Sequence, residues 1–339
     1  MQVYKNINSC QPLAMTGDRP TGPLHLGHLV GSLENRVKMQ EDFHLTVLVA
    51  DTQALTDHAF SKEEFRRNIT EVMKNYLAVG LCPEKVTFAL QSSLHALGQG
   101  ALLLSPLVST SEMQRNPTVR QEIKDKNFSG VPLGFFSYPL FQAADILLLG
   151  SGVVPVGLDQ APMIEITNKV IGRLNARAKK QVFAECEALY SQTPKLVGID
   201  GKSKMSKSRG TAISIVAPKD VLEKSVMMMY TDPLHLKKSD PGRVEGNVVF
   251  SYLDAFCEDR ERVFELKNHY KKGGLGDVTI KRYLIDVLSS RLEPYRAKYN
   301  EISDDLALDV LRAGTETARQ KSAAELEKLE DVLGVFRAN

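Results

Sequence analysis

Short apolar runs alternate with amphipathic stretches over the first 200 residues. Residues 45–50, 86–90 and 153–156 are β-rich runs without polar alternation, a pattern typical of strands buried on both faces of a parallel sheet. Residues 60–80 and 162–174 carry apolar stripes at helical spacing. Strands separated by helices predict a doubly wound, Rossmann-like α/β sheet.

Beyond about residue 210 the pattern becomes almost purely helical. The predicted helices are 222–230, 252–270, 279–299 and 307–333. A polar, glycine-flanked stretch at 201–210 precedes them. We therefore expect a catalytic α/β domain over residues 1–210, with inserted connecting helices, and an α-helical domain over residues 211–339.

Composition narrows the class of protein. The chain has 339 residues, 43% of them hydrophobic and 25% charged, which excludes disorder, collagen and coiled coil as the main organisation. Its four cysteines, Cys10, Cys82, Cys186 and Cys257, form no C-x-x-C pair. A disulfide framework or a cysteine zinc site is not expected, and a reducing cytoplasm is the expected compartment.

No membrane segment is expected. The N-terminus lacks the apolar core and cleavage site of a signal peptide. Residues 86–111 carry no charge, but several polar residues and Pro106 interrupt them, so a buried strand followed by a buried helix is favoured. Because the net charge is only +2, nucleic-acid binding would require a local basic patch.

The first candidate for chemistry is T-G-D-R-P-T-G-P-L-H-L-G-H at residues 16–28. This glycine-rich turn runs into an amphipathic helix, and the exposed N–H groups at such a helix start favour phosphate. His25 and His28, three residues apart, are also possible metal ligands, although no third ligand lies nearby in the sequence. An ordinary surface turn is the remaining interpretation.

The second candidate is K-M-S-K-S at residues 204–208. Lysines interleaved with serines between glycines suit a mobile polyphosphate clamp, in which ammonium groups act as point charges and hydroxyls add hydrogen bonds. A solvated basic loop is the alternative for this segment alone.

The third candidate lies in the apolar segment 138–149. Tyr138, Gln142 and Asp145 fall at i, i+4 and i+7 on one helix face, with Pro139 expected in the first turn. A carboxylate in apolar surroundings is costly unless it is paired or functional. Asp145 is therefore either bonded to a structural neighbour or ready to accept a hydrogen bond from an indole N–H or phenol O–H.

The fourth candidate is V-P-V-G-L-D-Q-A-P at residues 154–162, between a predicted strand and a predicted helix. Ligands of α/β folds bind at the carboxyl ends of strands. Asp159 there suits ribose hydroxyls, and a simple helix cap is the alternative.

The first two motifs occur in the same chain, the histidine motif before the lysine motif, in a segment predicted to form an α/β fold. H-L-G-H followed some 180 residues later by K-M-S-K-S resembles the paired signatures of class I aminoacyl-tRNA synthetases. Further segments, R-N-P-T-V, Y-P-L-F-Q-A-A-D-I-L and V-P-V-G-x-D-Q among them, resemble the bacterial tryptophanyl-tRNA synthetase family over roughly residues 13–335. The tyrosyl-tRNA synthetases are the alternative, because Gln142 stands where many tryptophanyl enzymes have methionine.

The resemblance implies an aminoacyl-tRNA ligase that joins L-tryptophan to tRNA(Trp) through an adenylate, using ATP with its Mg²⁺. It implies no protein metal site, a Rossmann catalytic domain, an anticodon-binding helical domain and a homodimer. Lys204 and Lys207 would clamp the leaving pyrophosphate, with His25 and His28 beside the phosphates and adenosine.

The resemblance also assigns the remaining binding residues. Those implied for the nucleotide are Arg19, Pro20, Thr21, Gly27, His28, Gly157, Leu158, Asp159, Leu196, Lys204, Met205, Ser206, Lys207 and Ser208. Those implied for the amino acid are Asp145 for the indole N–H, Tyr138 and Gln160 for the α-amino group, with Gln142 nearby. Gln53 and Arg120 stand where relatives often have histidine and lysine.

Two other classes of protein compete with this interpretation. A small-molecule nucleotidyltransferase also uses an H-x-G-H loop, but does not normally combine it with K-M-S-K-S and a helical domain of this size. A synthetase-like paralogue that binds nucleotide or RNA without catalysis is disfavoured by the intact Lys204, Lys207, Asp145 and Asp159.

Overall fold

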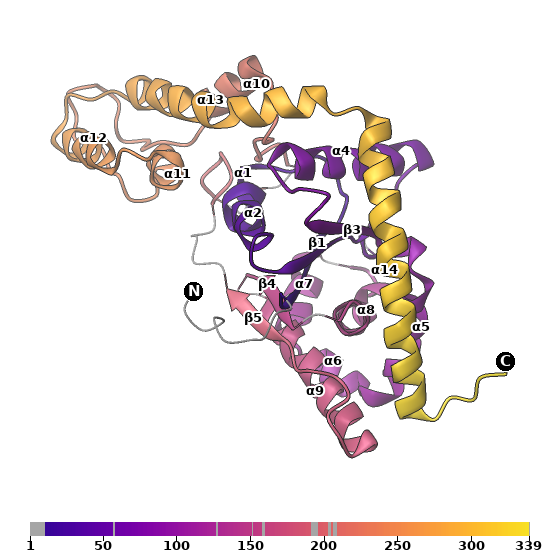
Figure 1. Ribbon diagram of the computed structural model, residues 1–339. Coiled ribbons are helices and arrows are strands. Elements are labelled where there is room, and N and C mark those ends of the chain that lie inside the picture. The colour runs from indigo at the N-terminus through magenta and orange to yellow at the C-terminus, as the bar shows by residue number, and fades with distance from the viewer. Residues whose placement is uncertain are drawn as a thin grey trace.

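A parallel sheet forms the centre of the molecule (Figure 1). The computed structural model describes residues 11–56, 58–126, 128–150, 152–157, 160–190, 196–202, 205 and 209–338. Within these residues the sheet has five strands in the order β3-β2-β1-β4-β5, all parallel. The strands are β1 (Leu13–Asp18), β2 (His44–Val49), β3 (Val86–Leu90), β4 (Val153–Val156) and β5 (Glu187–Tyr190).

Helices pack on both faces of this sheet. Those of the first half of the chain are α1 (Leu26–His28), α2 (Glu34–Met39), α3 (Asp51–Ala54), α4 (Lys62–Ala78), α5 (His95–Leu104), α6 (Thr110–Arg115), α7 (Pro117–Lys126), α8 (Leu133–Leu148) and α9 (Ala161–Ala178). On β2, Val47 joins the core shared with α2 and α4, while Leu48 joins the core shared with α5, α8 and α9. This alternation across a strand covered on both faces confirms the doubly wound sheet.

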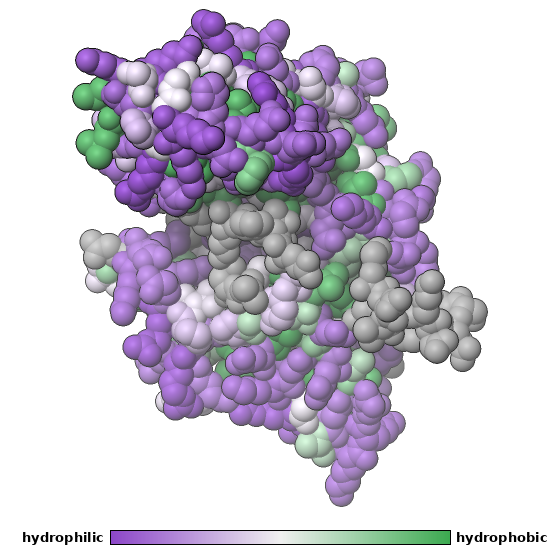
Figure 2. Space-filling model, turned by 90° about the vertical axis from the view of Figure 1, so that its left-hand side faces the viewer, coloured by the Kyte–Doolittle hydropathy of each residue, from purple (hydrophilic) through white to green (hydrophobic). Residues whose placement is uncertain are grey.

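The last third of the chain is helical, as predicted. Its helices are α10 (Lys219–Met227), α11 (Val248–Phe256), α12 (Arg260–Lys272), α13 (Asp277–Glu301) and α14 (Asp304–Leu333). Helices α10 to α13 form a lobe above the sheet (Figure 1), and the face of this lobe in Figure 2 carries mostly hydrophilic side chains. The domain boundary at residue 210 stays a prediction.

Helix α14 leaves the lobe and packs along β3, α4 and α5 (Figure 1). The approach is close, since a Cβ added at Gly314 would lie 2.2 Å from the carbonyl oxygen of Phe88. The Thr315 hydroxyl accepts a hydrogen bond from the Leu90 N–H at 3.0 Å. The edge strand is thereby covered along its length, which protects it from pairing with another chain.

Two local predictions are wrong. The predicted helix 252–270 is two helices, because the chain breaks after Phe256 and Asp259 caps α12 by accepting from the Arg262 N–H at 2.8 Å. Pro139 lies inside α8 and not in its first turn, since the helix begins six residues earlier at Leu133. Strands β1 and β5 were not predicted. Among the described helices, none is long and apolar enough to cross a membrane.

A buried ion pair fixes the carboxyl end of β1. Asp18 accepts hydrogen bonds from the Arg36 guanidinium at 2.5 and 3.3 Å and from the Tyr76 hydroxyl at 2.7 Å. Burial alone would raise the pKa of Asp18, but the charge of Arg36 and these bonds outweigh it and hold that pKa well below its usual range. The side chain of Arg36 is only 3% exposed, so the pair is nearly shielded from solvent.

We expect Asp18→Ala to lower the free energy of unfolding by about 3 kcal/mol at neutral pH, because it leaves the Arg36 charge buried without its partner. Since the pKa of Asp18 is depressed, this stabilisation is present above the ordinary carboxyl pKa and is lost as the pH falls below it. Urea unfolding measures both effects. The control is Glu41→Ala, which breaks the exposed Lys85–Glu41 pair and should cost less than about 1 kcal/mol. Equal losses in the two variants would contradict the prediction.

Candidate active site

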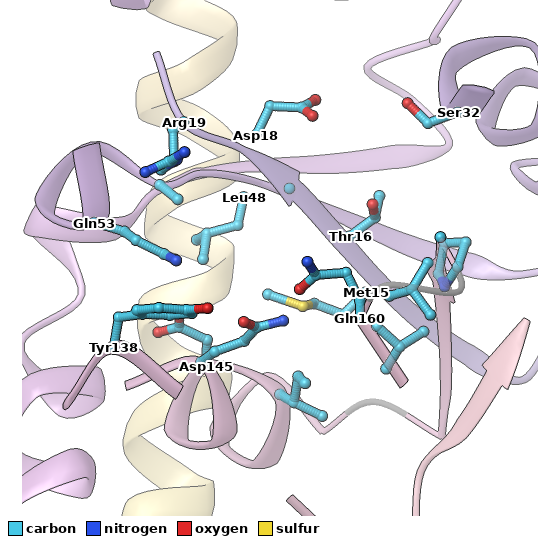
Figure 3. A pocket seen from close by; sticks show the side chains of 18 of the residues that line it. Met15, Thr16, Asp18, Arg19, Ser32, Leu48, Gln53, Tyr138, Asp145 and Gln160 are labelled. Atoms are coloured by element: carbon cyan, nitrogen blue, oxygen red, sulfur yellow. The ribbon is translucent and has the colours of Figure 1, made fainter. Parts of the chain in front are cut away.

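A pocket of about 430 Å³ opens where the carboxyl ends of β1, β2 and β4 meet α8 (Figure 3). This is the edge at which open α/β sheets bind ligands. Apolar side chains from three strands and α8 form part of its wall, namely Met15, Leu48, Phe135, Ile146 and Val154. Such a wall with a few convergent polar groups is typical of a site for a small molecule.

Asp145 is the acidic group on the α8 side of this pocket, and its side chain points into it beside Tyr138 (Figure 3). The residue is 3% exposed, and its Oδ2 accepts a hydrogen bond from the Gln91 Nε2 at 2.7 Å. Burial raises the pKa of Asp145 to about 8, against the opposing effect of this hydrogen bond. The carboxyl is therefore mostly protonated at neutral pH until another donor stabilises its charge.

Gln91 directly follows β3 and is itself held in place. Its Oε1 accepts hydrogen bonds from the Thr52 hydroxyl at 2.6 Å and from the Gln53 N–H at 3.1 Å. Two donors on one oxygen identify it as the carbonyl oxygen, so the amide N–H groups must face Asp145. The side chain thus links α3 to α8 across the end of the sheet.

Tyr138 lies about two turns before Asp145 on the same helix face. Its hydroxyl donates to the Glu122 Oε2 of α7 at 2.8 Å, and its ring meets Phe135 edge to face at 5.6 Å. Gln142 and Gln160 also line the pocket. The predicted amino-acid residues are therefore brought together around one cavity.

The two histidines of the glycine-rich turn cap the helix that follows. The His25 Nδ1 accepts from the Gly27 N–H at 3.1 Å, and the His28 Nδ1 accepts from the His25 N–H at 3.2 Å. This reciprocal pair is a capping box, and it explains the three-residue spacing. The two Nδ1 atoms are thereby occupied by backbone N–H groups, which fixes the orientation of both rings.

The pocket also gathers part of the predicted nucleotide set. Arg19, Thr21, His28 and Gly157 line it together with the amino-acid residues. Met205 packs on the turn nearby, since a Cβ added at Gly27 would lie 3.3 Å from its sulfur and 3.0 Å from the His25 ring. A larger residue at position 27 would require the His25 ring or the Met205 side chain to shift.

Other predicted residues lie outside the pocket wall. His25, Pro20, Gly27, Leu196 and Met205 do not line it, and Leu196 and Met205 are buried in the core on the α2 side of the sheet. Arg120 is exposed on α7. Leu158, Asp159, Lys204, Ser206, Lys207 and Ser208 lie outside the described residues.

The sequence predictions missed several residues at the site, namely Asp18, Ser32, Arg36, Gln91 and Glu122. The sequence did contain an indication for Gln91. It directly follows the predicted strand 86–90 and therefore had to lie at the carboxyl edge of the sheet, where ligands bind. Asp18 would have followed from the same rule if β1 had been predicted. Among the residues that the structure describes, no group of three or more His, Cys, Asp or Glu could hold a metal ion.

Comparison with known proteins agrees with this geometry. Residues 10–293 match the family described as tRNA synthetases class I (W and Y). A tryptophan–tRNA ligase of Clostridium longisporum is 45% identical over 330 residues, which cover 95% of this chain and 97% of that relative. A tryptophan–tRNA ligase of Lactococcus lactis subsp. lactis is 45% identical over 335 residues, covering 96% and 98%.

Solved structures give the same picture. A tryptophanyl-tRNA synthetase from Campylobacter jejuni, complexed with ADP and tryptophan, is 28% identical and superposes with a TM-score of 0.82 over 95% of this chain and 99% of that one. A tyrosyl-tRNA synthetase from Archaeoglobus fulgidus shares the fold at 24% identity, with a TM-score of 0.65 over 85% of this chain and 90% of that one.

The raised pKa of Asp145 predicts how stability depends on pH. This carboxyl titrates near its ordinary value of 3.8 in the unfolded chain and near 8 in the folded protein. The folded state binds the extra proton between these values, so stability falls as the pH rises through them, by at most about 1.4 kcal/mol per pH unit.

Asp145→Asn should flatten this part of the profile of unfolding free energy, measured in urea from about pH 5 to pH 9. The other titratable groups that line the pocket, Asp18, Arg19, His28, Arg36, Glu122 and Tyr138, remain in the variant and contribute equally to both profiles. Identical slopes for the wild type and the variant would refute the assignment.

Proposed function

Because the chain belongs to the class I tRNA synthetases specific for tryptophan or tyrosine and is a tryptophan–tRNA ligase, we propose that the pocket above α8 binds L-tryptophan beside ATP. The amino acid is activated to tryptophanyl-adenylate, with release of pyrophosphate, and is then transferred to tRNA(Trp). The observation that carries this proposal is the buried carboxyl of Asp145 beside the apolar part of the cavity wall.

The pocket suits an indole ring for a physical reason. An apolar wall stabilises the flat ring by removing it from water, and Asp145 offers an acceptor for the one polar N–H of that ring. Tyr138 and Gln160 supply polar groups for the α-amino end, with Gln142 and Gln53 nearby. The hydroxyl of a phenol could also donate to Asp145, so tyrosine is the alternative substrate. Gln142 supports this alternative, because many tryptophanyl enzymes have methionine at that position.

The first step is attack of the amino-acid carboxylate on the α-phosphorus of ATP, with cleavage of the bond to the leaving pyrophosphate. The nucleophile is already ionised at neutral pH, so the protein need not remove a proton. Catalysis then consists of positioning the two substrates and stabilising charge on the phosphates. Magnesium enters with ATP as part of the substrate.

The residues that line the pocket on the β1 side serve the nucleotide. The rings of His25 and His28 hold the helix start in place, and the helix start faces the phosphates. Arg19 adds a positive charge, Thr21 a hydroxyl and Gly157 an approachable backbone. Lys204 and Lys207, with Ser206 and Ser208, hold the leaving pyrophosphate, and Asp159 with Leu158 holds the ribose.

Pro20 and Gly27 shape the turn around the nucleotide, and Leu196 and Met205 lie near the adenine. The second step passes the aminoacyl group to the 2′-hydroxyl at the 3′ end of the tRNA, whose anticodon lies on the helical lobe. The protein works as a homodimer in the cytoplasm. These assignments rest on the family resemblance, and the shared pocket of Arg19, Thr21, His28 and Gly157 supports only the nucleotide site among them.

The decisive experiment is ATP–pyrophosphate exchange without tRNA, with tryptophan and tyrosine supplied separately. Exchange with tryptophan alone is expected. Exchange with tyrosine alone would transfer the specificity to the neighbouring family, and no exchange with either amino acid would favour a paralogue without catalysis.

We expect Asp145→Ala to lower kcat/KM for tryptophan by about a thousandfold or more, because a site built around a ligand hydrogen bond loses most of its selectivity without it. The KM for ATP should change by less than about threefold, since Asp145 faces the apolar part of the pocket. Exchange kinetics with each substrate varied in turn measure both values. A variant that lost only ATP affinity would contradict the role of Asp145.

The helical lobe allows a matched test of tRNA contact. Lys237 and Lys238 are exposed, and no described carboxylate lies within ion-pair distance of them, whereas Lys267 lies 2.6 Å from Asp254. We expect the double variant Lys237→Ala, Lys238→Ala to raise the KM for tRNA. The slope of log binding constant against log salt concentration should become shallower, by an amount that corresponds to about one to two lost phosphate contacts. Lys267→Ala is the control, and adenylate formation should be unaffected in both. If the control variant weakened tRNA binding equally, these lysines would have no special role.

A further inference from the structure

The three segments around Asp145 form a chain of hydrogen bonds that the predicted site residues do not include. It runs from the Thr52 hydroxyl and the Gln53 N–H, through the carboxamide of Gln91, to Asp145 Oδ2. Gln91 is 6% exposed and joins the end of β2 and α3 to α8. It does not line the pocket itself, so it acts on a ligand through its partners that do, chiefly Asp145, to which its amide donates, and Gln53, whose backbone N–H it fixes.

The geometry divides the two oxygens of Asp145 between protein and pocket. Gln91 occupies Oδ2, and no described residue donates to Oδ1, while the side chain of Asp145 faces the cavity (Figure 3). Rotation of the carboxyl would break the 2.7 Å bond and leave the Gln91 amide buried without an acceptor. One oxygen is therefore held so that the other is presented to a ligand in a fixed direction.

We propose that Gln91 is a positioning residue for amino-acid specificity, which orients Asp145 so that its free oxygen accepts the ring N–H of tryptophan. The proposal rests on the proposed function of the pocket and deepens it. The carboxamide suits this task because its carbonyl is fixed by two donors, so its N–H cannot exchange places with its oxygen. A hydroxyl or carboxylate at position 91 would lack this fixed polarity.

The electrostatics of the site agree with the geometry. Burial raises the pKa of Asp145, and the bond from Gln91 is the one opposing cause found among the described residues. Gln91 thus brings the carboxyl nearer to the ionised form, which is the stronger acceptor for a neutral N–H. The ligand N–H would complete the stabilisation of the charge.

The test compares tryptophan with its sulfur analogue, 3-(1-benzothiophen-3-yl)alanine, in which sulfur replaces the ring N–H. Adenylate formation is measured by ATP–pyrophosphate exchange with each, and the ratio of the two kcat/KM values reports use of the N–H. Gln91→Leu should lower this ratio by about tenfold or more, chiefly through a higher KM for tryptophan. The KM for ATP should stay within about twofold of the wild type.

Gln99 provides the matched control. Its Nε2 also donates to a buried carboxylate, Glu330, at 2.8 Å, but this bond joins α5 to α14 away from the pocket. Gln99→Leu should therefore leave the ratio unchanged even if it lowers stability. Thr52→Val, at an exposed position, removes one of the donors that fix the Gln91 carbonyl and should lower the ratio by a smaller factor.

The outcomes separate the two proposals. A wild type that activates neither compound would overturn the proposed function itself. A wild type that prefers tryptophan, with the same ratio in Gln91→Leu and Thr52→Val, would overturn the role of Gln91 alone. An equal fall in Gln99→Leu would also overturn it, since the effect would then be one of stability. If Gln91→Leu fails to fold, the ratio in Thr52→Val decides.

Discussion

The ion pair between Asp18 and Arg36 is the constraint on which the arrangement of the site depends. It ties the last residue of β1 to α2, and the hydroxyl of Tyr76 adds α4 to the same point. On the same helix, Glu34 pairs with Arg291 of α13 at 3.0 Å. The strand that carries the glycine-rich turn, the helix that the turn opens and the helical lobe are thus connected through a single short helix, α2.

Two of the carboxyls that line the pocket, Asp18 and Asp145, are in opposite electrostatic states. Asp18 stays charged because a guanidinium and a phenol surround it, whereas among the described residues Asp145 has the amide of Gln91 alone to offset its burial. The charge of Asp18 is therefore already satisfied by the protein, and that of Asp145 is available only when a ligand supplies a further donor. This contrast assigns the two acids different tasks, one in holding the fold and the other in selecting a ligand.

Periodicity alone was sufficient to predict the sheet class, three of its strands and most of its helices. The strand β1 was not predicted because its residues, L-A-M-T-G-D, include a glycine and end in a charged residue. Its strand conformation depends on pairing with β2 over six residues, which the local sequence does not reveal. The apolar residues on both sides of residue 257 keep helical spacing, so periodicity predicted one helix. The break comes from Asp259, which caps the start of α12, and a capping residue does not alter the apolar spacing. Tyr138, Gln142 and Asp145 were placed correctly on one face because α8 is helical throughout, even though Pro139 lies in its interior.

Gln91 could not be assigned a role from the sequence, because its partners Thr52 and Asp145 are 39 and 54 residues away. Its backbone position depends on a still more distant element. The N–H of Leu90, the preceding residue, donates to Thr315 of α14, which is 225 residues further along the chain. The end of β3 is held by this helix on one side and by α3 on the other, so the Gln91 carboxamide reaches Asp145 from a backbone with little freedom to shift. Precision at the acceptor of the pocket therefore comes from the last helix of the chain as much as from the residues that a ligand would touch.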